Sequence, residues 1–225
     1  IDATAEGAGR ARVTLSNQTG YGTLRYTLDG SAPSQASPMY RAPFDATMPV
    51  TVRAAAFADG ETLASPRARR LDPVSIVRLG SDRLRMCSNA LPLRLEGGAG
   101  EAGIRYDIGI LDPCWIYPGL DLSGISRVDV RVGTVPDNFQ LWHDAARIVT
   151  RPPHTRAGEL EIHQDTCDGP LLASLSMATV RPGVPSTLHA APARMPRGTH
   201  DLCLFFTGRS PRFLRVVEWV APIPH

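Results

Sequence analysis

Two runs near the C-terminal end of the chain constrain its fold most strongly. In residues 158–167, Leu160 and Ile162 alternate with charged or polar side chains, and residues 198–208 place apolar side chains at every second position in the same way. A period of two is typical of β-strands that bury one face. We therefore expect both runs to be strands of one sheet.

The four cysteines extend this prediction. Cys167 and Cys203 have the parity opposite to the leucines, so in neighbouring strands their sulfurs would lie on the same side of the sheet, where a bridge is possible. Cys87 and Cys114 lie in predicted loops that could meet. None has CxxC spacing, which favours two disulfides, Cys87–Cys114 and Cys167–Cys203, over a zinc site. Two disulfides imply an oxidising compartment.

Composition narrows the class of protein. The 225 residues include 20 Gly and 20 Pro and show no long amphipathic helix, which indicates an all-β protein rich in turns. The net charge of +2 is ordinary, and the arginines are scattered among acids, so we expect no nucleic-acid partner. No apolar run approaches the length of a membrane span. The N-terminus lacks a leader, so we expect any signal peptide to have been removed or to belong to a longer precursor.

Residues 1–74 predict a small immunoglobulin-like sandwich. Asp29 and Gly30 form a strong turn signal, and Pro66 interrupts the last strand, as suits an edge position. Alternating apolar positions mark the expected strands, which are 12–16, 24–28, 49–57 and 62–71.

Residues 26–33, 37–40 and 50–60 carry a family resemblance. They resemble the small sandwich domain that follows the catalytic barrel in bacterial chitobiases and β-N-acetylhexosaminidases of glycoside hydrolase family 20. In that family the domain is an accessory without catalytic residues. The resemblance implies an upstream catalytic domain in the same polypeptide.

Residues 75–225 predict a larger jelly-roll sandwich. Strand patterns occur here at 91–95, 106–110, 128–132, 139–142, 171–177 and 215–220, besides the two runs described first.

Four segments of this region, 158–162, 167–175, 198–208 and 216–220, look like carbohydrate-binding module family 6. The resemblance implies sugar binding. Family members carry a sugar-stacking tryptophan ahead of the second run, but residues 178–187 contain no aromatic side chain. Members often hold a structural calcium through an acid of the first strand, a role that Glu96 would take here. We expect no other cofactor.

Other aromatic side chains are candidates for a sugar platform. If the stretch around them is extended, Trp115 and Tyr117 project to one side. In the expected strand 139–142, Trp142 lies on the face opposite to the core-facing side chains, and Asn138 and His143 are close to it in sequence. Aromatic faces with a few polar groups are typical of sugar sites. The alternative, and the commoner case, is that Trp115 and Trp142 fill the core or a domain interface.

No catalytic constellation is evident. Glu159 and Glu161 share a strand face, but exposed carboxylates on a polar face explain them better than an acid pair for glycoside hydrolysis. His200 and Asp201 are neighbours in a strand and point to opposite faces. We expect no enzyme activity in this chain.

Together these features predict a non-catalytic carbohydrate-binding region of a secreted bacterial β-N-acetylhexosaminidase-like glycoside hydrolase. The expected partners are GlcNAc-containing glycans, such as chitooligosaccharides or peptidoglycan-derived glycans, and the expected location is periplasmic or extracellular. The alternative is a purely structural pair of domains that braces the catalytic barrel or mediates oligomer contacts. A solvent-exposed aromatic pair in a cleft would favour the first.

Overall fold

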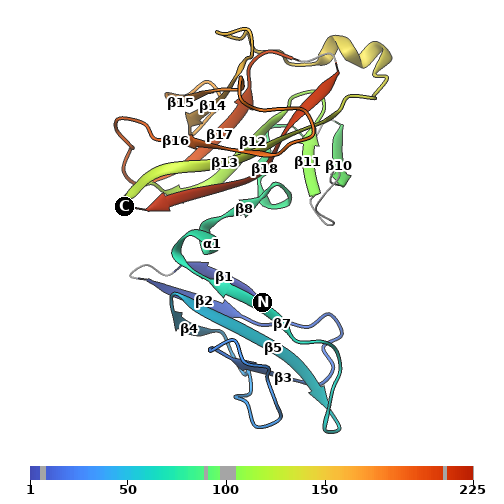
Figure 1. The fold of residues 1–225 in the computed structure, drawn as a ribbon, viewed down its shortest axis with the longest axis vertical. Helices are drawn as coiled ribbons and strands as arrows, with labels where there is room; N and C mark the ends of the chain where they lie inside the picture. The colour runs from blue at the N-terminus through green and yellow to red at the C-terminus, as the bar shows by residue number, and fades with distance from the viewer. Residues whose placement is uncertain (6–8, 89–90, 97–104, 210–211, 225) are drawn as a thin grey trace. The chain divides into compact units, whose positions relative to one another are not determined.

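The computed structural model describes the chain except residues 6–8, 89–90, 97–104, 210–211 and 225. The described chain forms two compact units, Ile1–Val77 and Arg78–His225 (Figure 1). The first unit ends with the short helix α1 (Pro73–Val77). Each unit is described by itself.

The first unit consists of two antiparallel sheets, as expected for a small sandwich. One sheet has the order β1 (Asp2–Ala5), β2 (Arg10–Thr14), β4 (Phe44–Thr47). In the other, β5 (Val50–Ala58) pairs with β3 (Thr23–Thr27), β6 (Glu61–Thr62) and β7 (Arg67–Leu71). The predicted last strand is divided in two around Pro66, which has no N–H to donate to a ladder.

The core of the first unit is small. Val13, Val52 and Leu71 are fully buried, and much of the rest is alanine, including Ala11 and Ala46. Along β2 the burial alternates strictly, as the period of two requires.

The second unit contains two larger antiparallel sheets and a hairpin (Figure 1). The five-stranded sheet has the order β15 (Leu171–Ser176), β14 (Glu159–Gln164), β17 (Thr199–Phe206), β12 (Cys114–Asp121), β9 (Arg85–Met86). The four-stranded sheet has the order β16 (Ser186–Ala190), β13 (Ile125–Pro136), β18 (Phe213–Pro224), β8 (Leu79–Gly80). The hairpin joins β10 (Pro92–Glu96) to β11 (Arg105–Gly109), and the 3-10 turns are η1 (Ser81–Arg83) and η2 (Trp142–Arg147).

The two runs that organise the sequence are paired strands. β14 and β17 are antiparallel neighbours, with Leu160 opposite Phe206 and Ile162 opposite Leu204. Their apolar faces share one buried cluster with Val130 of the four-stranded sheet. The two sheets therefore face each other across one core, and the predicted all-β sandwich class is confirmed.

Residues 139–142 were expected to form a strand, and this is wrong. They lie in irregular chain that leads into η2 at Trp142. Within the described residues, none of the helices has the length and apolar character needed to cross a bilayer.

Candidate functional site

Residues 137–158, which connect β13 to β14, form the longest connection described in the second unit. Apart from η2, this loop has no regular structure; η2 is the yellow coil near the top of Figure 1. Irregular connections of this length are uncommon in compact domains, and those that occur are often functional.

The loop is fixed at its N-terminal end. The Asp137 N–H donates to the Arg212 carbonyl at 2.9 Å, and the Arg209 guanidinium lies 3.2 Å from the Asp137 carboxylate. The chain that enters the loop is thereby bound to the β17–β18 connection.

The C-terminal part of the loop is fixed as well. The Val149 N–H donates to the Leu111 carbonyl at 2.7 Å, and the Gly208 N–H donates to the Arg151 carbonyl at 2.7 Å. The Arg151 guanidinium also forms an ion pair with Asp112 at 3.1 Å. Because both ends are held, the residues between them are presented on a constrained span.

Trp142 lies on that span and points into solvent. It is 80% exposed, the largest exposed fraction among the large apolar side chains described. Its φ is 44°, a left-handed conformation that costs energy for any residue with a Cβ. Strained backbone of this kind concentrates at functional sites. Asn138, Phe139 and His143 are exposed on the same span, so the predicted group of Trp142, Asn138 and His143 lies together on one loop.

Trp115 and Tyr117 lie elsewhere, and their prediction as a sugar platform is wrong. Trp115 is fully buried, its Nε1–H donates to the Asp107 carbonyl at 2.8 Å, and its ring meets Phe206 edge-on at 5.7 Å. Tyr117 is also in the core, and burial raises the pKa of its hydroxyl to about 12. β12 lies inside the five-stranded sheet, and the face that carries these two rings is the core face.

A shallow cavity of about 50 Å³ lies beside the C-terminal part of the loop. Its lining includes Ile148, Val149 and the arginines Arg151, Arg209 and Arg215. The volume suits a few water molecules but not a pyranose ring. A sugar at this end of the unit would therefore lie over the loop surface rather than inside a pocket.

Glu159 is buried, contrary to the expectation of an exposed carboxylate. Its oxygens accept hydrogen bonds from the backbone N–H groups of His154 at 3.0 Å and Thr155 at 2.8 Å, and from the hydroxyl of Thr207. Hydrogen bonds from Thr155 and Thr207 hold the pKa of Glu159 at about 2. The expectation failed because residues 154–155 fold back against the outer face of β14.

Glu161 is buried too, and it bonds to other partners. Its Oε2 is 3.0 Å from Nε2 of His163, and its Oε1 is 3.4 Å from Nε2 of His154. The His163 ring stacks on Phe205 at 5.0 Å, and the Arg151 guanidinium lies 4.3 Å from the centre of that same phenyl ring. These contacts occupy the outer face of the sheet with internal partners, an arrangement unlike an acid pair open to substrate.

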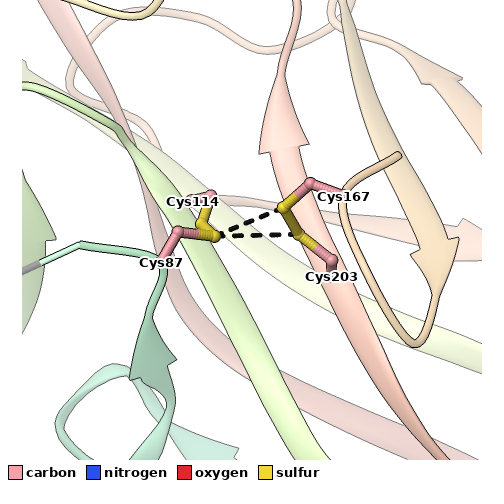
Figure 2. A group of neighbouring side chains, drawn as sticks. All are labelled: Cys87, Cys114, Cys167 and Cys203. Carbon is pink, nitrogen blue, oxygen red and sulfur yellow. Dashed lines mark hydrogen bonds between the residues drawn. A yellow bond between two sulfur atoms is a disulfide. The ribbon is translucent and has the colours of Figure 1, made fainter. Parts of the chain in front are cut away.

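The two disulfides, Cys87–Cys114 and Cys167–Cys203, are present as predicted. Figure 2 shows them side by side. The Glu96 backbone pairs with Arg105 in the β10–β11 hairpin, but its side chain lies outside the described residues, so its role as a calcium ligand stays a prediction.

Comparisons with known proteins give the following findings. A search of curated proteins gave no match. The chain is similar in structure to a family 6 carbohydrate-binding module from Clostridium cellulolyticum in complex with xylose, at 17% identity over 64% of this chain and 93% of that chain, with a TM-score of 0.43. It is similar to a β-1,3-glucan binding family 6 module from Bacillus halodurans at 18% identity over 65% and 94%, with a TM-score of 0.39.

A third solved structure spans both units. It is a glycoside hydrolase family 43 arabinoxylan arabinofuranohydrolase from Bacillus subtilis in complex with cellotetraose, at 13% identity over 100% of this chain and 54% of that chain, with a TM-score of 0.44. For the first unit the resemblance drawn from sequence is confirmed by a family model: residues 4–66 match the chitobiase/β-hexosaminidase C-terminal domain.

Proposed function

We propose that this chain is a non-catalytic carbohydrate-binding region of a glycoside hydrolase and that its second unit holds sugar over the loop 137–158. The observation that carries the proposal is Trp142, whose ring is 80% exposed at a backbone φ of 44° on a loop fixed at both ends. Burying such a ring against a ligand is favourable, because it removes apolar surface from water.

The chemistry of this loop suits a sugar ring. The apolar C–H face of a pyranose packs on an aromatic face, and nearby polar groups fix its orientation by hydrogen bonds to hydroxyls. Trp142 supplies the face, while Asn138, Gln140 and His143 supply exposed donors and acceptors on the same span. Phe139, 38% exposed, adds apolar surface.

The proposed glycan and parent enzyme rest on the first unit. Its match to the chitobiase/β-hexosaminidase C-terminal domain supports a β-N-acetylhexosaminidase-like parent with an upstream catalytic domain, and hence GlcNAc-containing glycans such as chitooligosaccharides or peptidoglycan fragments. Two disulfides support a periplasmic or extracellular location. The internal partners of Glu159 and Glu161 support a binding role rather than catalysis.

One observation favours the structural alternative. Trp115 and Tyr117 are buried, so the exposed pair of rings expected of a binding cleft is absent from β12. In that case Trp142 would contact another protein domain rather than a glycan.

A glycan-array screen of the full chain, followed by titration of the best ligand, separates these functions. Trp142→Ala is expected to weaken glycan binding by roughly tenfold or more, about 1.4 kcal/mol, as for an aromatic anchor at the centre of an interface. Tyr21→Ala is the matched control, because Tyr21 is also aromatic and 59% exposed but lies in the first unit. Absence of binding to any glycan, or equal binding by the Trp142 variant, would favour the structural role.

A further inference from the structure

The two disulfides form one cluster of four sulfur atoms. The Sγ atoms of Cys87, Cys114, Cys167 and Cys203 all lie within 4.8 Å of one another. The Cys87 sulfur is 3.2 Å from that of Cys167 and 3.9 Å from that of Cys203, the contacts drawn as dashed lines in Figure 2. Each sulfur therefore has neighbours in the other bridge as well as its own partner.

The four cysteines come from four separate segments. Cys114 and Cys203 lie on the paired strands β12 and β17, where Cys203 is opposite Ile116 and Cys114 is opposite Phe205. The sheet therefore holds these two sulfurs on one face. Cys87 directly follows β9 and Cys167 follows β14, so both belong to connections whose side chains have more freedom to adjust.

The surroundings of the cluster are apolar. Cys114 and Cys203 are fully buried, Cys87 and Cys167 are half-buried, and Phe205 and Ile116 pack against them. Four thiolates are the donor set of structural zinc sites, in which Zn–S bonds of about 2.3 Å in a tetrahedron place the sulfurs about 3.8 Å apart. Between the two bridges, the Cys87 sulfur is 3.9 Å from that of Cys203 and 3.2 Å from that of Cys167, so the four sulfurs come near this spacing once each bonded pair separates on reduction.

We propose that the reduced chain binds one Zn²⁺ through all four cysteines, so that this cluster has two mutually exclusive states: two disulfides, or a tetrahedral zinc site. Conversion of the first state requires two equivalents of a dithiol reductant, which together give four electrons and four protons, break both S–S bonds to form four thiols and are themselves oxidised to disulfides. Zinc then replaces the thiol protons without changing its own oxidation state. In either state the same four segments are held together on the outer face of the five-stranded sheet.

The test uses the full chain, reduced under argon with a phosphine, freed of reductant and titrated with Co²⁺. We expect one Co²⁺ per chain, with the thiolate charge-transfer and visible bands of tetrahedral cobalt, and loss of both spectra when one equivalent of Zn²⁺ is added. The oxidised chain is expected to show neither. If the reduced chain loses its circular dichroism without metal, it is refolded with one equivalent of Zn²⁺, which is expected to restore the spectrum and remain bound through gel filtration.

Two variants make the assignment specific. Cys87→Ser removes a ligand from a half-buried connection and is expected to weaken metal binding by roughly 100-fold or more, since even an outer partner of a ligand contributes about 10–100-fold. Ile116→Val alters the same face and keeps all four sulfurs, so its affinity is expected to stay within about twofold. A reduced chain that binds no metal in either protocol, or a Cys87→Ser chain that binds like the wild type, overturns the proposal.

Discussion

Glu159 and Thr207 hold each other through reciprocal hydrogen bonds. The Glu159 N–H donates to Oγ1 of Thr207 at 2.7 Å, and the Thr207 hydroxyl donates to the Glu159 carboxylate. The same carboxylate accepts the backbone N–H groups of His154 and Thr155. One buried side chain therefore joins the start of β14, the end of β17 and the loop that carries Trp142.

This arrangement makes stability depend on pH. The folded-state pKa of Glu159, about 2, lies below its ordinary value of 4.5 because the carboxylate accepts hydrogen bonds from Thr155 and Thr207. A depressed carboxyl pKa contributes stability that is fully present above the unfolded value and lost as pH falls through the folded value. Glu159→Gln should therefore lower the melting temperature near pH 7, with a difference from wild type that shrinks between pH 4.5 and 2. A difference that stays constant across thermal melts in this range would contradict the assignment.

The pair formed by His200 and Asp165 is expected to give folding stability a different pH dependence, with a loss of stability as pH rises. The ring Nδ1 of His200 is 3.0 Å from the Asp165 carboxylate, and its Nε2 is 3.0 Å from the Arg197 carbonyl. The hydrogen bond to Asp165, followed by that to Arg197, raises the pKa of His200 above 6.5, and His200 in turn lowers the pKa of Asp165 below 3.8.

The pair should therefore stabilise the fold most between pH 3.8 and 6.5 and lose its effect as pH rises through the folded pKa of His200. His200→Gln is expected to show its largest deficit in melting temperature inside this window. NMR titration of His200 provides a direct check, since a folded pKa at or below 6.5 would exclude the pairing.

Gly158 is required for close approach of the backbone. Its φ is 70°, and a Cβ there would meet the Thr207 carbonyl oxygen and the Arg215 guanidinium, both of which are already hydrogen-bonded to each other. Gly183 has a similar φ of 73° with open space around it. We expect Gly183→Ala to cost about 1 kcal/mol from backbone strain and Gly158→Ala about 3 kcal/mol, because the second also displaces packed groups. Urea unfolding measures the loss in free energy of unfolding for both variants. Equal losses would contradict the prediction, because they would mean that the neighbours of a Cβ at residue 158 move aside without cost.

Trp115 is expected to act on stability and not on affinity. Its ring is fully buried, so Trp115→Ala should destabilise the second unit by about 3–5 kcal/mol. Trp115→Phe keeps part of the packing but loses the hydrogen bond to the Asp107 carbonyl, and should cost less. If the Trp115→Phe chain folds but binds the glycan more weakly, then Trp115 contributes to binding, contrary to this prediction.

The pairing of β14 with β17 was predictable. Side chains in a β-strand alternate between two faces, and the apolar face of each strand, which carries Leu160 in β14 and Leu204 in β17, is expected to be buried. Parity alone did not reveal which faces are covered. Trp115 and Tyr117 share one face of β12, but the sequence did not say that this face is the inner one. Glu159 was expected to be exposed because it shares the polar face of its strand. Alternation did not reveal that residues 154–155 cover this face or that Thr207 bonds to the carboxylate.

The site was predictable only in part. Trp142 was selected from its parity in an expected strand, and Asn138 and His143 were selected because they are close to it in sequence. The three are exposed because this stretch is a loop fixed to Leu111 and Arg212. The disulfide partners followed from parity and loop position. The contact between the two disulfides could not be predicted, because the four cysteines belong to separate segments and their spacing in the sequence does not indicate that they cluster.

The most direct test of sugar binding is an NMR titration of the three tryptophan indole N–H signals with the best glycan from the array. Trp142→Phe assigns the signal of Trp142, and Trp115 serves as an internal control because its N–H donates to the Asp107 carbonyl in the core. We expect the Trp142 signal to shift in a saturable way while the Trp115 signal stays in place. Saturable glycan binding that leaves the Trp142 signal unmoved would contradict the account.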